Sequence, residues 1–249
     1  MRVTLQFHPD WPFGEGLVIE SMARDGVYRS QFETGSSNGG LTAHEGGDRW
    51  RWESRLFDGR YDGRPPSERP VYGALNHRDR AHGGSIRFGS AYLRLRPEVT
   101  ARCTFCFPDS AFQPEVVSGP DLVDQLIASA ETGVHDLLDD YVEAHVHGGI
   151  VIERDVEAVV LDPCFRDTAV ERAGAALGCG VEWHPGFRVA TERLDPGYRG
   201  EEYVALARLL GEVITPDVVG AAARSGTHDP QALKRVWHYL ARFGRVGAA

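Results

Sequence analysis

Short apolar runs and turn-forming residues predict a strand and a helix at the start of the chain. Val3 to Phe7 has the composition of a short strand, and Pro9 to Gly16 is a loop with two prolines and two glycines. Apolar residues then recur at helical spacing from Leu17 to Ala23, and Gly26 provides a C-terminal stop. The pattern predicts a strand, a loop, a helix and a turn.

The next hundred residues predict further short strands. Gln31 to Gly47 is rich in glycine and small polar residues, which indicates a loop. Asp48 to Glu53 alternates charged and aromatic residues, which predicts a half-buried strand with Arg49 and Arg51 on one face. Further strands are predicted at three places, the last two forming a hairpin or meander: Val71 to Leu75, Ile86 to Leu95 and Arg102 to Phe107.

The remaining sequence changes from mixed elements to helices. Helices are predicted from Pro120 to Ile127 and from Val134 to Tyr141, and strands from Val142 to Ile152 and from Ala158 to Leu161. After Pro163 the pattern favours four helices: Thr168 to Leu177, Glu201 to Leu210, Pro216 to Arg224 and Pro230 to Phe243. We therefore expect an α+β protein with mixed or antiparallel sheets of short strands. Residues 1–163 would form a core and residues 164–249 a helical extension packed on it.

Composition narrows the classes of function. The 249 residues are 42% hydrophobic and 25% charged, which is typical of a globular chain. A net charge of −9 disfavours an extended nucleic-acid surface. Neither a secretory signal pattern nor an apolar run of membrane-spanning length occurs in the sequence, so cytoplasmic residence is the expectation. Four cysteines in so long a chain do not indicate a disulfide framework.

Three ionisable residues alternate along one predicted strand. In Tyr141 to His147 a period of two places Glu143, His145 and His147 on the same face. They are compatible with a catalytic carboxylate and its helpers, with a two-histidine, one-carboxylate metal site that needs a further ligand, or with a solvated edge. The pattern alone leaves these three interpretations open.

Two other residues stand beside turn signals. His8 leaves the first strand and precedes a proline, where it would lie at the rim of a cleft or on the surface. Tyr72 precedes Gly73, which would let a flat ligand approach the backbone, although a core tyrosine is the simpler interpretation.

Taken in order, His8, Tyr72 and Glu143 resemble the histidine, tyrosine, glutamate branch of the ADP-ribosyltransferase superfamily. In that family the first strand ends with histidine, a helix and a glycine turn follow, a tyrosine lies on a later strand, and glutamate begins another strand. The resemblance covers residues 3 to 161. It implies a split β-sandwich and cleavage of NAD at the nicotinamide ribose, with ADP-ribose passed to an acceptor that the sequence does not identify.

The resemblance also implies roles for individual residues. Glu143 would stabilise the positive charge that develops on the ribose, Tyr72 would stack on nicotinamide, and His8 would bind the adenosine ribose. The residues expected to contact NAD are His8, Arg29, Thr34, Ser37, Asn38, Gly39, Arg49, Arg51, Tyr72, Gly73, Ser90 and His145.

The sequence departs from the family pattern at two positions. Pro9 stands where the family has glycine, whose N–H binds the nicotinamide amide, and proline has no N–H. Tyr141 replaces the usual glutamine or glutamate, which favours an acceptor other than arginine. The whole chain also resembles an uncharacterised bacterial family of unknown function, through motifs such as Val181 to Gly186 and Val236 to Leu240. Metal-dependent catalysis and a non-catalytic ligand-binding module remain the alternatives.

Overall fold

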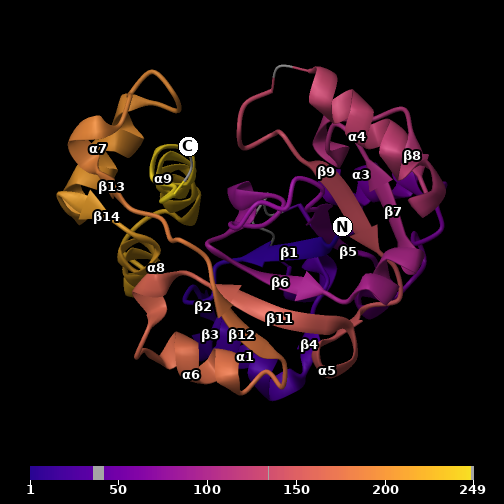
Figure 1. Ribbon diagram of the computed structural model, residues 1–249, viewed down its shortest axis with the longest axis horizontal. Coiled ribbons are helices and arrows are strands. Elements are labelled where there is room, and N and C mark those ends of the chain that lie inside the picture. Colours follow the sequence, from indigo (N-terminus) through magenta and orange to yellow (C-terminus); the bar gives the residue numbers. More distant parts are fainter. Residues whose placement is uncertain (36–41, 134, 248–249) are drawn as a thin grey trace.

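The main sheet of the protein has strands from most of the sequence. The computed structural model describes residues 1–35, 42–133 and 135–247. In this part of the chain, hydrogen bonds join the main-sheet strands in the order β12-β11-β6-β1-β5-β9-β7-β8 (Figure 1). Every neighbouring pair is antiparallel except β11 and β12. The bounds are β1 Val3–Phe7, β5 Val71–Leu75, β6 Ala91–Leu95, β7 Cys103–Cys106, β8 Val117–Ser118, β9 Val142–Val146, β11 Val156–Leu161 and β12 Gly180–Trp183.

The other described elements are short strand pairs and helices. The strand pairs are β2 (Pro12–Phe13) with β3 (Gly16–Leu17), β4 (Val27–Tyr28) with β10 (Ile150–Val151), and β13 (Val189–Ala190) with β14 (Val213–Ile214). The helices are α1 Val18–Asp25, α2 Gln31–Thr34, α3 Asp48–Leu56, α4 Val123–Thr132, α5 Ile152–Asp155, α6 Ala169–Ala175, α7 Glu201–Leu210, α8 Pro216–Ser225 and α9 Pro230–Phe243. The expected α+β class, with a mixed sheet of short strands and C-terminal helices, is confirmed.

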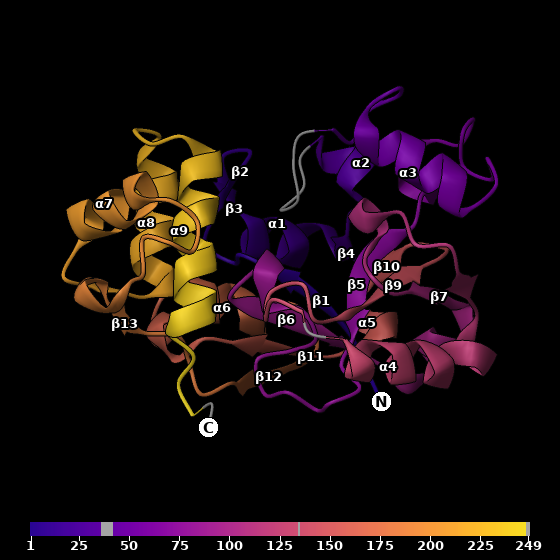
Figure 2. The ribbon, with the colours of Figure 1, turned by 90° about the horizontal axis from the view of Figure 1, so that it is seen from above.

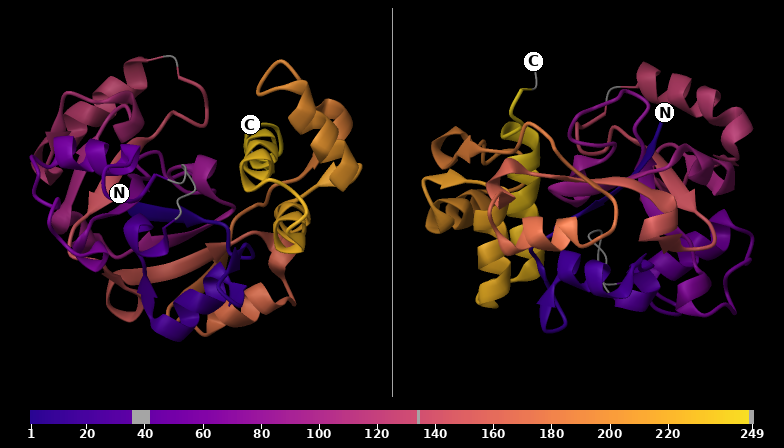
Figure 3. Two further views of the ribbon diagram at one scale, coloured as in Figure 1. Left: turned by 180° about the vertical axis from the view of Figure 1, so that it is seen from behind. Right: turned by 60° about the horizontal axis from the view of Figure 1, so that its bottom comes forward.

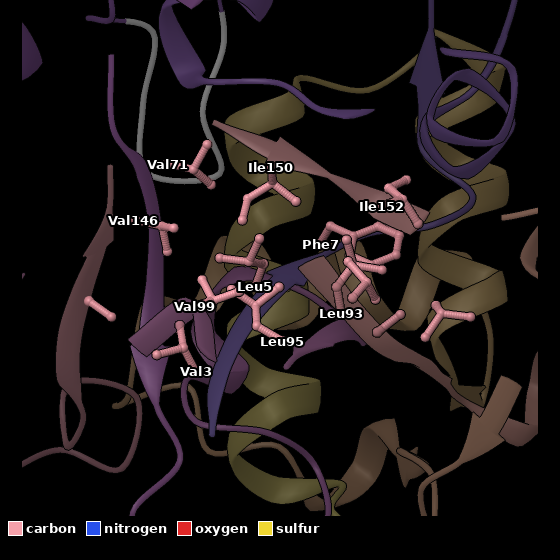
Figure 4. Packing of buried hydrophobic residues seen from close by; sticks show 14 of the residues in the cluster. Val3, Leu5, Phe7, Val71, Leu93, Leu95, Val99, Val146, Ile150 and Ile152 are labelled. Carbon is pink, nitrogen blue, oxygen red and sulfur yellow. The ribbon is translucent and has the colours of Figure 1, made fainter. Parts of the chain in front are cut away.

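The central strands alternate apolar and polar side chains, and this alternation separates a core from a polar face. On β1, Leu5 and Phe7 point into the apolar core shown in Figure 4, whereas Thr4 and Gln6 occupy the opposite face. Cross-strand neighbours share a face, so the pairing of Ala74 with Thr4 and with Glu143 extends the polar face across three strands. One face of the sheet packs against the core, and the other carries the ionisable residues.

Local signals predicted several helix ends correctly. Helix α1 stops at Gly26, which has the left-handed φ of 68° that glycine adopts without strain. The bounds of α7 and α9 agree with the sequence, and the Asp229 carboxylate accepts hydrogen bonds from two N–H groups in the first turn of α9. These ends were predictable because caps depend on adjacent residues only.

The C-terminal helices form a second packed unit. Helices α7, α8 and α9 lie on one side of the molecule, while α2 and α3 lie on the other (Figures 2 and 3). The second buried cluster begins at Phe187 on the C-terminal side and is centred on Trp237 and Tyr239. Helix α6 packs on α1, and β12 pairs with β11, so the sheet unit continues past residue 163. The chain therefore passes from the sheet to the unit of C-terminal helices near residue 185.

The prediction of a strand at Asp48 to Glu53 is wrong. These residues begin helix α3, in which Arg49 and Glu53 lie one turn apart and are buried, while Arg51 is exposed. The alternation of charged and aromatic residues agrees with the period of two of a strand. Arg49 and Glu53, however, are four residues apart and so also lie on one face of a helix. Contacts of Arg49 and Glu53 with Tyr72 on β5 decide between the two patterns.

Other predicted elements and pairings also differ from the structure. Residues 86–88 form a 3₁₀ turn before β6, and β6 and β7 are not neighbours, so they form no hairpin. Residues 137–139 form a turn instead of the predicted helix. Strand β10 pairs with β4 and not with β9, because consecutive left-handed glycines, Gly148 and Gly149, redirect the chain. Within the predicted loop, residues 31–34 form the single turn α2.

Candidate functional site

A cavity of about 520 Å³ opens between the polar face of the sheet and the C-terminal helices. Its walls include residues of β1, β5 and β9 on the sheet, of α1 and α3, and of α8 and α9. His8, Tyr72 and Glu143 all line it, as do Arg29, Thr34, Arg49 and Gly73. Residues separated by more than 130 positions in the sequence therefore meet at one cavity of the size that small-molecule ligands occupy.

Glu143 is a buried carboxylate with several hydrogen-bond donors. Its Oε1 accepts from His145 Nε2 at 2.9 Å and from the Ser110 N–H at 3.3 Å, and its Oε2 accepts from the Ser110 hydroxyl at 3.2 Å. Burial alone would raise the pKa of Glu143, but the His145 hydrogen bond, the charge of Arg49 and the Ser110 hydroxyl lower it below its ordinary value. The site thus holds a fixed negative charge at neutral pH.

Tyr72 is held between two groups of helix α3. Its hydroxyl donates to Glu53 Oε2 at 2.9 Å, and the Arg49 guanidinium lies 4.6 Å from its ring centre. Glu53 is also paired with the buried Arg69 at 2.5 Å. Burial and the neighbouring Glu53 carboxylate raise the pKa of Tyr72 well above its ordinary value, so Tyr72 is a neutral, oriented ring.

His8 follows the end of β1 and lines the cavity beside the rings of Trp11 and Trp237. Its ring stacks on Trp11 with centres 4.4 Å apart and meets the edge of Trp237 from α9. Burial and the charge of Lys234 lower the pKa of His8 to about 3. A neutral imidazole at this place donates or accepts one hydrogen bond on each nitrogen.

Comparison with known protein families gives a match to an uncharacterised family. The family described as "Protein of unknown function (DUF3626)" matches residues 2–132 and 120–243. The chain belongs to this family. No match was found among curated proteins. The two matched segments of this DUF3626 protein contain both the sheet unit and the C-terminal helices, so both sides of the cavity fall within the family.

Some residues expected to contact the ligand lie elsewhere in the DUF3626 chain. Arg51 is exposed and pairs with Asp48. Ser90 is buried away from the cavity, and its carbonyl accepts from His184. His145 is buried behind Glu143. Ser37, Asn38 and Gly39 lie outside the described residues.

Three residues that the sequence did not single out for the site are positioned to act there. Ser110 bridges Arg49 and Glu143, Glu53 anchors Tyr72, and Lys234 lines the cavity from α9. Burial and the charge of Arg87 lower the pKa of Lys234 to about 8. Lys234 is the only lysine in the sequence, but it belongs to no sequence motif that would mark it as a site residue.

The metal set that the sequence left open, with His147 beside Glu143 and His145, is not assembled among the described residues. Thr104 lies between the two imidazoles and hydrogen bonds to both. Cys106, Glu143 and His145 instead bring a sulfur, an oxygen and a nitrogen within 4.8 Å of one another. These three atoms are engaged in mutual hydrogen bonds.

Two further observations concern the helices and the cavity of this DUF3626 chain. No helix in the described ranges is long and apolar enough to cross a membrane. The described lining of the cavity contains four cationic residues and a single carboxylate, although the whole chain is acidic. The cations are Arg29, Arg49, Arg87 and Lys234. The cavity therefore favours a ligand that carries negative charge.

Proposed function

We propose that the protein is an NAD-dependent ADP-ribosyltransferase. The observation that carries the proposal is the convergence of His8, Tyr72 and Glu143, in that chain order, on one cavity. His8 directly follows β1, Tyr72 lies on β5 and Glu143 lies near the start of β9, an order that supports the resemblance to the superfamily.

The charge of the cavity supports a pyrophosphate-containing substrate. Arg29 is paired with Asp25, and Arg87 with Asp139. Arg49 and Lys234 form no ion pair with any carboxylate of the described residues, and they approach from opposite units. A pyrophosphate carries two negative charges, which these two groups would neutralise. Arginine offers the planar donor pair that suits phosphate oxygens, and lysine offers a point charge.

The apolar part of the lining supports the two bases of NAD. Aromatic rings border the cavity, among them Trp11, Phe13, Tyr28, Tyr72 and Phe88. Flat rings of this kind stack on nicotinamide and adenine. The usual backbone contact to the nicotinamide amide is not available, because Pro9 has no N–H and its carbonyl accepts from Ile19 at 3.1 Å. Side chains must recognise the amide instead.

The chemistry follows from the fixed charge of Glu143. The bond between C1′ of the ribose and nicotinamide breaks, and both electrons leave with the ring nitrogen. Positive charge develops on the ribose, as in glycoside cleavage, and the Glu143 carboxylate stabilises it. The acceptor then bonds to C1′ and releases its proton. Tyr72 would hold the departing ring, and His8 the distant ribose.

The first test replaces the carboxylate. Glu143→Gln keeps the size of the side chain and removes its charge, so nicotinamide release from NAD should fall by about 10²- to 10³-fold, as when a preorganised electrostatic group is removed. Glu153→Gln, at an exposed glutamate of α5, is the matched control and should retain the wild-type rate. The measurement is nicotinamide release in the presence of cell extract, which supplies the acceptor.

Other results would separate the alternatives. Equal release by wild type and Glu143→Gln would contradict the proposal. Saturable NAD binding without any release would identify a ligand-binding module. Stoichiometric metal in the purified protein that disappears with Cys106→Ala would favour metal-dependent chemistry instead.

A further inference from the structure

A chain of hydrogen bonds leads from Glu143 away from the cavity. Behind the carboxylate, His145 Nε2 lies 2.9 Å from Glu143 Oε1. The other ring nitrogen of His145, Nδ1, lies 3.0 Å from the hydroxyl of Thr104 on the neighbouring strand β7. His145 is completely buried, so Thr104 determines what its Nδ1 can do.

The chain continues to a second cavity. The Thr104 hydroxyl also lies 3.0 Å from His147 Nε2, and His147 Nδ1 lies 2.6 Å from the hydroxyl of Tyr61. Tyr61 lines a cavity of about 330 Å³ together with Arg60 and Arg64. Four hydrogen bonds thus connect the carboxylate of the first cavity with a tyrosine of the second.

With both imidazoles neutral, the hydrogens of this chain fit in one way. The Glu143 carboxylate only accepts, so His145 carries its proton on Nε2 and its Nδ1 must accept from Thr104. The single Thr104 proton is then used, so its oxygen accepts from His147 Nε2. His147 Nδ1 in turn accepts from the Tyr61 hydroxyl. All four donors point toward Glu143.

We propose that Thr104, His147 and Tyr61 are positioning residues that hold the ring of His145 in the orientation from which Nε2 donates to Glu143. A hydrogen bond to the other ring nitrogen fixes the orientation of a functional imidazole. Without the Thr104 hydroxyl, His145 Nδ1 loses this hydrogen bond, and the ring can turn so that Nε2–H no longer points at the carboxylate. Glu143 would then lose a donor and hold its charge less well.

The environment of His147 agrees with this direction. Burial lowers the pKa of His147 to about 4, so its ring is neutral at physiological pH and carries one proton. The phenyl ring of Phe57 packs edge-to-face with both imidazoles, and its centre lies 5.1 Å from that of His145 and 5.3 Å from that of His147. This packing restricts rotation of the two imidazole rings. The titratable and charged groups that face Glu143 itself are Arg49, Tyr72, Cys106, Asp109, Tyr141 and His145.

The tautomers can be measured without any substrate. Long-range ¹⁵N–¹H spectra should show wild-type His145 and His147 protonated on Nε2 and accepting on Nδ1. Thr104→Ser keeps the hydroxyl and should keep this spectrum. Thr104→Val removes the hydroxyl and should weaken the hydrogen bond from His145 Nε2 to Glu143, which shifts the Nε2–H resonance of His145. Wild-type Nδ1–H on either ring, or an unchanged His145 in Thr104→Val, would overturn the proposal.

The consequence for Glu143 rests on the proposed function and has its own readout. In Thr104→Val, nicotinamide release at neutral pH should fall about 10-fold, the effect of losing an orienting partner. The acidic limb of its pH profile should move upward by about one pH unit. Tyr61→Phe should shift both in the same direction by less, and Thr104→Ser should shift neither. An unchanged pH limb in Thr104→Val contradicts the proposal, because a purely structural effect would lower the rate without moving the limb.

The two proposals can fail separately. If the wild type releases no nicotinamide, the proposed transferase activity is wrong, and titration of the Glu143 carboxyl by ¹³C NMR still decides this inference. If activity is present and the pKa of Glu143 is the same in Thr104→Val and wild type, only the positioning role is wrong.

Discussion

Individual residues of the site differ in how far sequence could identify them. His8, Tyr72 and Glu143 were predictable because their order and strand positions form a pattern. Ser110 was not, because its role depends on contacts with residues 61 and 33 positions away. His145 was assigned to the ligand, but it lies behind Glu143 and acts on the carboxylate. Sequence order thus identified the groups that face the cavity better than the groups that support them.

The two arginines of α3 give a matched comparison at this scale. Arg49 lines the cavity over Tyr72, whereas Arg51 is exposed. Arg49→Met should weaken NAD binding by about 2 kcal/mol, or roughly 30-fold, the contribution of a charged hydrogen bond. Arg51→Met should leave the dissociation constant unchanged. Isothermal calorimetry measures both, and equal effects would show that Arg49 has no special role.

Among the elements, helix ends were easier to predict than the choice between helix and strand. Caps such as Gly26 and Asp229 act on neighbouring residues, so the sequence contains the whole signal. Helix α3 was mistaken for a strand because its alternation fits both periods, and contacts with β5 settle the outcome. The pairing of β6 with β1 and β11 likewise depends on packing across the whole sheet.

Helix α8 is fitted closely against the end of β1. A Cβ atom at Gly220 would lie 1.7 Å from Asp10 Oδ2, and Asp10 is buried and paired with Arg224 at 2.7 Å. Alanine favours a helix over glycine by about 1 kcal/mol. The clash should exceed this, so Gly220→Ala should lower the free energy of unfolding by about 1–3 kcal/mol.

Urea unfolding of Gly220→Ala, Asp10→Ala and the double variant forms a mutant cycle. Because Asp10→Ala removes the atoms that clash, the double variant should be more stable than the sum of the single effects predicts. Additive losses would mean that Gly220 is required for another reason.

For the whole molecule, the C-terminal helices complete the site as well as support it. The sequence predicted a helical extension correctly, but it did not show that α9 faces the cavity with Lys234 and contacts His8 through Trp237. Such contacts between distant segments follow from the packing of two units. His238, on the same helix, is fully buried, and neither of its ring nitrogens has a hydrogen-bond partner among the residues that the structure describes.

Buried histidines make the fold sensitive to acid. Burial lowers the pKa of His8 to about 3, of His147 and His184 to about 4, and of His238 to about 2, from 6.5. Between these pKa values and pH 6.5, the unfolded chain therefore binds more protons than the folded protein. The free energy of unfolding consequently falls as the pH drops below 6.5. Each histidine contributes up to about 1.4 kcal/mol per pH unit. Asp10, whose pKa burial raises to about 6, acts in the opposite sense.

Urea unfolding at pH 5 to 8 measures this dependence. His238→Leu should flatten the decline between pH 6.5 and 5, because one neutral buried imidazole is removed, while stability at pH 8 should change less. A wild-type stability that is constant from pH 7 to pH 5 would show that the histidines take up protons in the folded state.

The single lysine gives the site a chemical label of its own. Apart from the N-terminus, Lys234 is the only primary amine in the sequence, and it lines the cavity with a pKa lowered to about 8. A mild acylating reagent therefore modifies the interior of the cavity at one position that mass spectrometry resolves from the N-terminal amine. A small molecule that occupies the cavity protects that position, so libraries of nucleotides can be ranked by footprinting without knowledge of the reaction.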